Sequence, residues 1–226
     1  MSKNSMIKVV GFVGTLAAGA ALVGSAVTGT GAYFTSSKDG NLAASKGHLT
    51  LNTTDPYLNF TDLMPGEDQT KNVDFNVDVT GKSDVWLVFD TNTEAYARFS
   101  GTKGNPLYAD GGLGRFGHFK VAVNGGGALF ESWNLQMAPA GTANCTDANG
   151  HGSNSPATSE GDTPSYCGVP AAMKLASNLS SREGRVLNMT FGITGRSRGQ
   201  LPAAVANVPF KLVATQVGVR PDALNY

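Results

Sequence analysis

The sequence predicts an all-β protein, a jelly-roll-like β-sandwich with long loop insertions and one or two short helices. In several segments apolar residues recur at every second position, as expected for strands with one buried face. Glycine is frequent, with 29 of 226 residues, and charged residues make up only 15%. Short Gly-, Asn- and Asp-rich turns separate the alternating segments. Many short strands joined by such turns are typical of sandwiches and jelly rolls.

The first 32 residues have the features of a signal peptide. Lys3 and Lys8 give it a positive start, and residues 9–27 are uncharged and rich in Ala, Gly, Val and Leu. Small residues end the segment at Ala32. We therefore expect cleavage between Ala32 and Tyr33 and a secreted protein, located in the extracellular matrix or at the cell surface.

An uncleaved membrane anchor is the alternative for this segment, because residues 9–37 carry no charge. After cleavage we expect contact with the membrane only during export. The remaining chain is predicted to consist of an extended N-terminal segment, residues 33–41, and one jelly-roll domain, residues 42–226. An extended segment of this kind can pair with the sheet edge of a neighbouring molecule.

Alternation assigns most of the strands. The uninterrupted apolar run at 85–89 predicts a central strand buried on both faces. Asn124–Gly127 predicts a hairpin turn. Short helices are expected at 93–99 and at 170–177, the second with Pro170 in its first turn. The other predicted strands are residues 48–53, 73–79, 119–123, 128–130, 185–193 and 208–219.

Two predicted loops, Ser100–Gly114 and Gln136–Gly168, exceed the usual connection length, which indicates surface insertions that have a role or are mobile. The only cysteines, Cys145 and Cys167, are predicted to form one disulfide, as in other exported proteins. Metal binding by this pair with His151 is the alternative, but the spacing fits no common zinc pattern.

The turn at Pro65 and Gly66 is predicted to be type II and structural, because Pro favours its second position and Gly its third. Acidic residues cluster near the same strand ends. Hard oxygen ligands suit Ca²⁺, so calcium is the one candidate cofactor, but we prefer the explanation that these are solvated turn acids and predict no cofactor. These acidic residues are Asp55, Asp62, Glu67 and Asp68.

Composition argues against several partners. The chain has 17 basic and 17 acidic residues and no run of Lys or Arg. Nucleic acid is therefore not expected as a partner, and neither is electrostatic attraction to a membrane.

The sequence contains five Asn-X-Ser/Thr sequons, and whether they are glycosylated depends on the host. They begin at Asn52, Asn59, Asn144, Asn178 and Asn188.

The sequence gives little support to the common classes of hydrolytic enzyme. A zincin needs two histidines at positions i and i+4 with an adjacent Glu, whereas His48, His118 and His151 are each isolated. One Gly-X-Ser-X-Gly match occurs, at residues 195–199, but a nucleophile elbow needs a helix directly after the serine turn and no helix is predicted there. We therefore predict no catalytic residues and no resident metal site.

The order of several segments resembles the TasA/camelysin family. The export and cleavage region Gly29–Phe34 is followed by Leu42–Leu51, which is similar to the family's first strand. Leu63–Asp68 and Lys71–Phe75 resemble its turn and second strand, and Phe210–Gln216 resembles its closing strand. Residues 90–205 show no such similarity, and the cysteine pair is not part of the family pattern.

The resemblance implies a jelly-roll subunit that is secreted and polymerises into biofilm-matrix or pilus-like fibres. In that family the N-terminal strand of one subunit inserts into the next, and a dedicated signal peptidase frees it. Carried over by position, the donor runs from Tyr33 to about Asn41. The partners would be other copies of the chain, head to tail, and other matrix or cell-surface components. The donor residues would be Tyr33, Phe34, Thr35, Ser36, Ser37 and Leu42.

Two other functions remain open. The first is a monomeric surface module that binds a glycan or a protein through its two long loops. The second is a metal-dependent protease, because the camelysin branch of the family has been classed in this way.

The segment after the aromatic pair departs from the family pattern, since Thr35-Ser36-Ser37 stand where an acidic residue is usual.

Overall fold

The structure is a computed structural model. It describes residues 34–35, 47–52, 57–79, 81–100, 112–158, 162–195 and 205–222. The chain divides into two units, Met1–Ala32 and Tyr33–Tyr226, and every described residue belongs to the second. The predicted signal peptide therefore lies outside the described residues. In the part of the chain that is described, no helix is long and apolar enough to cross a membrane.

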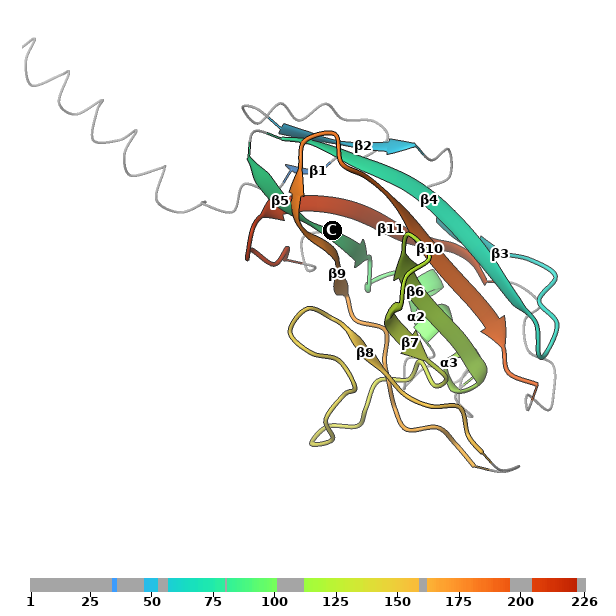
Figure 1. Ribbon diagram of the computed structural model, residues 1–226. Coiled ribbons are helices and arrows are strands. Elements are labelled where there is room, and N and C mark those ends of the chain that lie inside the picture. The colour runs from blue at the N-terminus through green and yellow to red at the C-terminus, as the bar shows by residue number, and fades with distance from the viewer. Residues whose placement is uncertain are drawn as a thin grey trace, which may run out of the picture. The chain divides into compact units, whose positions relative to one another are not determined.

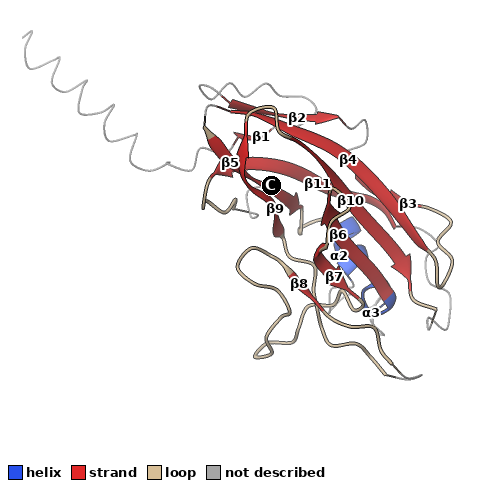
Figure 2. Ribbon diagram, in the orientation of Figure 1, coloured by secondary structure: helices blue, strands red, loops and turns tan. Residues whose placement is uncertain are grey.

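The described strands form two sheets that make a sandwich-like all-β fold, so the predicted fold class is confirmed (Figures 1 and 2). The first sheet has the order β1-β11-β5-β9, with β3 also paired to β11, and the second has the order β2-β4-β10-β6-β7-β8. The strands are β1 Phe34–Thr35, β2 Gly47–Asn52, β3 Tyr57–Phe60, β4 Asp68–Val79, β5 Lys82–Phe89, β6 Gly117–Val123, β7 Ala128–Ser132, β8 Gly152–Ser153, β9 Ala172–Ser180, β10 Gly184–Ile193 and β11 Val205–Gln216.

The order of the main strands is that of a jelly roll. If β1, β4, β5, β6, β7, β9, β10 and β11 are numbered 1 to 8, the first sheet has the order 1-8-3-6 and the second has 2-7-4-5. These are the two four-stranded sheets of a jelly roll. β2 extends the second sheet beyond β4, and β3 shares β11 with β1. The short strand β1 therefore occupies the first position of the fold.

The core lies between the two sheets and is rich in aromatic side chains. Thr93 is the N-cap residue of α2 (Glu94–Ser100), and its hydroxyl accepts the N–H of Tyr96 at 3.2 Å. The helix directs Tyr96 and Phe99 into the core. The ring of Phe99 meets that of Phe119 edge to face, with centroids 4.9 Å apart. Contacts of this geometry add to the free energy gained by burial.

β5 is the central strand that its apolar run predicts. It pairs with β11 on one side and with β9 on the other. All residues from Ser83 to Phe89 are buried. Val85, Leu87 and Phe89 belong to the main core. Because strand residues alternate between faces, the second apolar cluster lies on the other face of this sheet. That cluster consists of Trp86, Val88, Ala172 and Val213.

The predicted hairpin is formed by β6 and β7. Asn124 and Gly125 both have positive φ, 54° and 64°, and the N–H of Gly126 donates to the carbonyl of Val123 at 3.0 Å. These are the features of a type I′ turn, which matches the right-handed twist of the flanking strands.

Two predicted elements are wrong. Residues 170–177 do not form a helix, because most of this segment belongs to β9, which pairs with β5. Its Ala, Met, Lys and Leu residues favour a helix locally. The hydrogen bonds and packing that this segment gains by pairing with β5 outweigh that preference. The last strand ends at Gln216 rather than at Val219, because a turn follows in which the Val219 N–H donates to the Gln216 carbonyl.

The region of the first predicted loop is described only in part. Residues 101–111 lie outside the described residues. A second short helix, α3 (Gly112–Phe116), follows them and leads directly into β6. The predicted count of one or two short helices agrees with the two in the described ranges.

Candidate functional site: the edge of β11

The candidate site is the edge of β11 that faces away from β5. Along its C-terminal half β11 pairs continuously with β5, from Phe210 opposite Phe89 to Gln216 opposite Ser83. Ala214 pairs with Val85 of β5 and also with Phe34 of β1. Since a strand has two edges, β1 lies on the edge opposite β5.

β3 pairs with the N-terminal half of the same strand. Pro209 opposes Tyr57, and the Asp90 N–H binds the Pro209 carbonyl from the β5 side. β3 therefore lies on the same edge as β1. Pro209 has no N–H of its own, so it cannot donate to a neighbouring strand. The residues Phe210–Leu212 separate the positions that pair with β3 from those that pair with β1.

Side chains alternate along this edge between the two faces of the sheet. Phe210, Leu212 and Ala214 belong to the main core, whereas Val213 belongs to the cluster on the outer face. In an antiparallel pair, residues directly opposite each other share a face. A strand in the register of β1 thus presents every second residue, beginning with the one opposite Ala214, to the core of the sandwich.

The structure places two of the predicted donor residues at this edge. Phe34 opposes Ala214 and Thr35 opposes Val213, antiparallel. Ala32, at the predicted cleavage site, lies outside the described residues. The same is true of the other predicted donor residues, which are Tyr33, Ser36, Ser37 and Leu42.

The turn at Pro65 and Gly66 joins the core to the start of β4. The Glu67 N–H donates to the Met64 carbonyl at 3.1 Å, and Gly66 has a φ of 91°, a conformation that favours glycine. The Gly66 N–H also donates to the carbonyl of Ile193 in β10 at 2.6 Å. The turn therefore anchors the first residues of β4 beside the end of β10.

The loop Gln136–Gly168 contains the predicted disulfide. Cys145 and Cys167 are bonded, with their Cα atoms 4.9 Å apart, and Cys167 is fully buried. Asparagine side chains hold the rest of the loop. Asn144 accepts the Gly168 N–H at 2.9 Å, and Asn154 donates to the Ser165 carbonyl at 2.6 Å.

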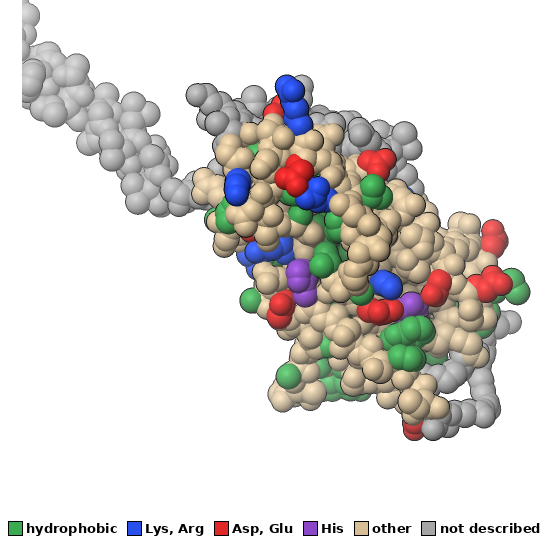
Figure 3. Space-filling model, in the orientation of Figure 1, with side chains coloured by type: hydrophobic (Ala, Val, Ile, Leu, Met, Phe, Trp, Pro, Cys, Tyr) green, Lys and Arg blue, Asp and Glu red, His purple; other side chains and the backbone are tan. Residues whose placement is uncertain are grey.

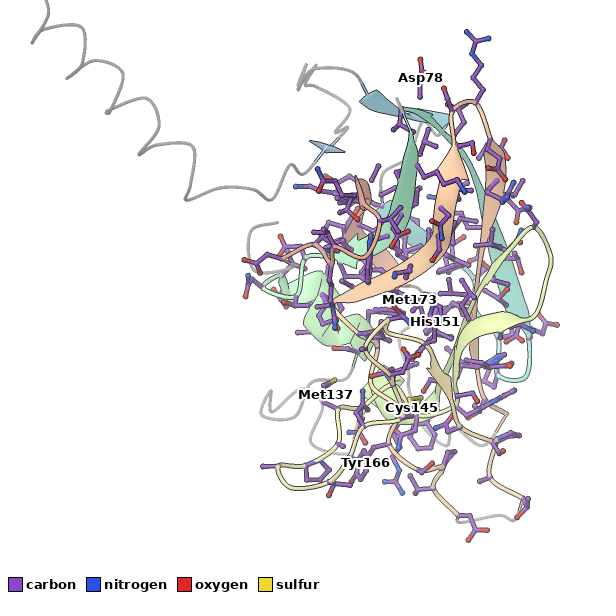
Figure 4. The ribbon with its side chains drawn as sticks, turned by 60° about the vertical axis from the view of Figure 1, so that its left-hand side comes forward. Asp78, Met137, Cys145, His151, Tyr166 and Met173 are labelled. Carbon is purple, nitrogen blue, oxygen red and sulfur yellow. A yellow bond between two sulfur atoms is a disulfide. The ribbon has the colours of Figure 1, made fainter. Side chains whose placement is uncertain are left out.

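This loop also carries exposed apolar side chains. Met137 is 50% exposed and Tyr166 is 40% exposed. Figure 4 shows both in the loop region together with Cys145, whereas His151 lies nearer to Met173 of β9. The ring Nε2 of His151 is 2.5 Å from the Lys174 carbonyl, and this contact ties the loop to that strand.

The histidines lie on separate elements. His48 is in β2, His118 in β6 and His151 in the disulfide loop. In the described ranges no group of three or more His, Cys, Asp and Glu side chains is arranged to hold a metal ion. Of the acidic residues considered for calcium, Asp55 is outside the described residues, and Asp68 contacts His118 at 3.0 Å.

A buried ion pair crosses the outer face of the first sheet. Asp84 is 1% exposed, and one of its carboxylate oxygens lies 3.1 Å from the Lys174 ammonium. The same ammonium lies over the Trp86 ring, 4.9 Å from its centroid. Burial by itself would raise the pKa of Asp84, but backbone N–H donors from Gly218 and Asn178 and the ammonium outweigh it and lower that pKa.

Neither this ion pair nor the contact of His118 with Asp68 and Glu131 is evident from the sequence. The alternation of β6 does place His118 and Lys120 on the face opposite Phe119. That signal marks an outward-facing histidine but not its partners, which come from two other strands. On the face shown in Figure 3, charged side chains of both signs are scattered among neutral ones.

No protein-family model matches the chain, and no match was found among curated proteins or among solved structures. The resemblance to the TasA/camelysin family therefore stays a prediction that rests on the quoted segments.

Proposed function

We propose that the chain is a secreted, non-catalytic fibre subunit of the TasA/camelysin type, which polymerises by exchange of its N-terminal strand. The observation that carries the proposal is the place of β1. This strand takes the first position of the jelly roll, at the β11 edge, and it lies at the start of the second unit of the chain. A terminal strand can leave its own sheet and enter that of a neighbour without unravelling the rest of the chain.

In the proposed fibre, residues 33–41 of one subunit bind the β11 edge of the next in the register of β1. Phe34 of the donor opposes Ala214 and so falls on the core face of the neighbour. Continued antiparallel pairing brings residue 36 opposite Leu212 and residue 38 opposite Phe210. The donor then meets β3 at Pro209. In this register the edge that β3 leaves open accommodates the donor as far as residue 38.

This contact joins two different surfaces, the N-terminal strand and the β11 edge. Such a heterologous, head-to-tail contact does not close and generates a filament. The disulfide agrees with the proposed extracellular location, because disulfides persist in oxidising compartments. Other matrix or cell-surface components are the further partners in this proposal.

The first experiment is to express the full chain, purify the protein from the culture medium, sequence its N-terminus and view it by negative-stain electron microscopy. We expect a mature end at or near Tyr33 and regular filaments. Monomers that persist across protein concentration, pH and added calcium would contradict the proposal.

A second experiment isolates the donor. A variant that lacks residues 33–41 of the mature chain should fold, with a cooperative melt, and should remain monomeric. A synthetic peptide of residues 33–42 should stop elongation of wild-type filaments, and a scrambled peptide of the same composition should not. Filaments of normal length from the deletion variant would exclude strand exchange.

The exposed side chains of the disulfide loop favour a second candidate function. Met137 and Tyr166 could contact a glycan or a protein on a monomeric surface module. In that case the secreted protein would stay monomeric and a Tyr166→Ala variant would lose ligand-dependent thermal stabilisation. A fibre subunit would polymerise equally well with this substitution.

A further inference from the structure

The outer edge of β9 is covered by the disulfide loop. β9 comes last in the order of the first sheet, so in the described part of the chain no strand pairs with this edge. The Phe89 N–H donates to the Ala171 carbonyl, which places the backbone groups of Ala171 on the β5 side. Because the backbone groups of a strand point alternately to its two sides, those of Ala172 and Lys174 point to the outer edge.

The tip of the loop, Asp147–His151, binds the backbone of β9 at this edge. The Lys174 N–H donates to the Asn149 carbonyl at 2.8 Å, and the Lys174 carbonyl lies 2.5 Å from Nε2 of His151. Figure 4 shows His151 near Met173 of the same strand. Both backbone groups that Lys174 would offer to a further strand are therefore occupied.

Gly150 allows the tip to approach the strand this closely. Its φ is 78°, a conformation that favours glycine. A Cβ at this position would lie 2.4 Å from the Ala172 carbonyl oxygen and 3.1 Å from the Met173 Cα. Both are backbone atoms of β9, so a side chain at residue 150 would force the tip away from the strand.

The tip is held in its conformation from within and at its base. The Asp147 side chain accepts the N–H groups of Asn149 at 2.8 Å and of His151 at 2.9 Å. The disulfide between Cys145 and Cys167 fixes the segment that precedes the tip. β8 follows the tip and pairs with β7 of the second sheet. The tip therefore connects the second sheet to the edge of the first.

The rest of the β9 edge is irregular. The register with β5 shifts between Lys174 and Ala176 and again between Ala176 and Leu179. Asn178, in the second of these intervals, has a positive φ of 57°. Bulges of this kind twist an edge strand and hinder the addition of another strand. The regular part of the outer edge is thus the part that the tip covers.

We propose that the loop tip is an edge guard of the first sheet, which prevents a second copy of this chain from pairing with β9. An uncovered regular edge offers a row of N–H and C=O groups to another strand. Two identical edges can pair antiparallel about a two-fold axis, so the partner that the guard excludes is the β9 edge of a second copy. The proposal does not depend on exchange of β1, because β1 lies at the opposite edge of this sheet.

The test compares Gly150→Ala with Gly141→Ala in protein secreted by cells that express the full chain. Gly141 lies in the same loop and has a φ of 86°, but a Cβ there would meet none of the described atoms within 4 Å. The control thus carries the same backbone strain without the clash. In Gly150→Ala, amide exchange of Lys174 should accelerate by about tenfold or more. Sedimentation should show association that rises with protein concentration, beyond that of wild type and of Gly141→Ala.

The form of the association depends on the wild type, and either form supports the guard. If the wild type is monomeric, Gly150→Ala should form dimers. If the wild type forms filaments, those of Gly150→Ala should attach side by side in negative-stain electron micrographs. Faster exchange at Lys174 without new association would overturn the proposal, because the uncovered edge would then need no guard. Unchanged exchange would overturn it as well, since the contact at Gly150 would not cover the edge.

If Gly150→Ala does not fold, His151→Ala provides a milder test. It removes the imidazole from the Lys174 carbonyl and leaves the backbone of the tip unchanged. We expect faster exchange of the Lys174 amide than in wild type, by a smaller factor than for Gly150→Ala, and association at high protein concentration. A His151→Ala protein that exchanges faster at Lys174 and shows no more association than wild type would refute the guard, as would one with unchanged exchange.

Discussion

The sandwich and the disulfide loop of this protein are held together by different interactions. Between the sheets, Phe119 and Phe191 are fully buried among other apolar side chains. The loop Gln136–Gly168 instead relies on one disulfide and on asparagine side chains such as Asn154. The comparison shows that a Gly- and Ser-rich segment can take a defined conformation with little apolar burial, provided that a covalent bond and amide groups replace it.

The largest effect should come from opening the core. Phe119 is fully buried and its ring meets those of Phe89, Phe99 and Phe191. We expect Phe119→Ala to lower the free energy of unfolding by about 4 kcal/mol, measured by urea denaturation. The control is Tyr166→Ala in the loop, which should change it by less than about 0.5 kcal/mol. Similar losses for the two would mean that the loop is part of the same core.

A slightly smaller effect should come from breaking the buried ion pair on the first sheet. Asp84→Asn leaves the Lys174 ammonium without its partner and should cost about 3 kcal/mol at neutral pH. The pKa of Asp84 is lowered in the folded state, so its contribution is present above the unfolded pKa and is lost as the pH falls.

The wild type and Asp84→Asn should therefore converge in stability in acid, when both are followed by urea denaturation at neutral and acidic pH. The matched control is Glu94→Gln, which removes an exposed ion pair with Arg98 and should change little at either pH. A gap between wild type and Asp84→Asn that stays constant with pH would contradict this account of the ion pair.

Removal of the disulfide should act mainly on the loop. Replacing Cys145 and Cys167 together by serine should lower the free energy of unfolding by about 2 to 3 kcal/mol, because the bond restricts the unfolded chain. Hydrogen exchange should then accelerate first at residues 144–168 and later, or not at all, in β5. Uniform acceleration across the molecule would show that loop and sandwich unfold as one unit.

The smallest effect should come from a single amide. Asn154 accepts the Trp133 N–H and donates to the Ser165 carbonyl. Asn154→Ala should cost about 1 kcal/mol and should quicken exchange of the Trp133 amide. The neighbouring exposed Ser153→Ala serves as the control. Equal effects of the two substitutions would show that the Asn154 side chain does not stabilise the loop.

Local sequence patterns predict the strands and turns of this fold, but they do not predict which strands lie next to each other in space. The alternation of Val73, Phe75 and Val77 and the Asn124-Gly125 turn each correspond to a strand or hairpin in the structure. The prediction of a helix at 170–177 was wrong because β9 pairs with β5, whose residues lie about 90 positions away in the sequence. The local sequence of the segment carries no information about that pairing.

The same limit applies to the sites. The link between Cys145 and Cys167 follows from a count of two cysteines, and the position of Phe34 at the β11 edge agrees with an N-terminal strand. The partners of His118 come from two other strands, so they emerge only once the register is known. Side chains that meet across a sheet are determined by register rather than by sequence distance.

The pairing of β1 with β11 inside one chain sets a concentration scale. Residues 36–46 tether β1 to β2, and a short tether holds a strand near its site at an effective concentration on the order of millimolar. Any free peptide or neighbouring subunit must compete with this resident strand. A competitor succeeds either by local crowding, as at an export site on a cell surface, or by making more backbone pairs than the two formed by Phe34 and Thr35.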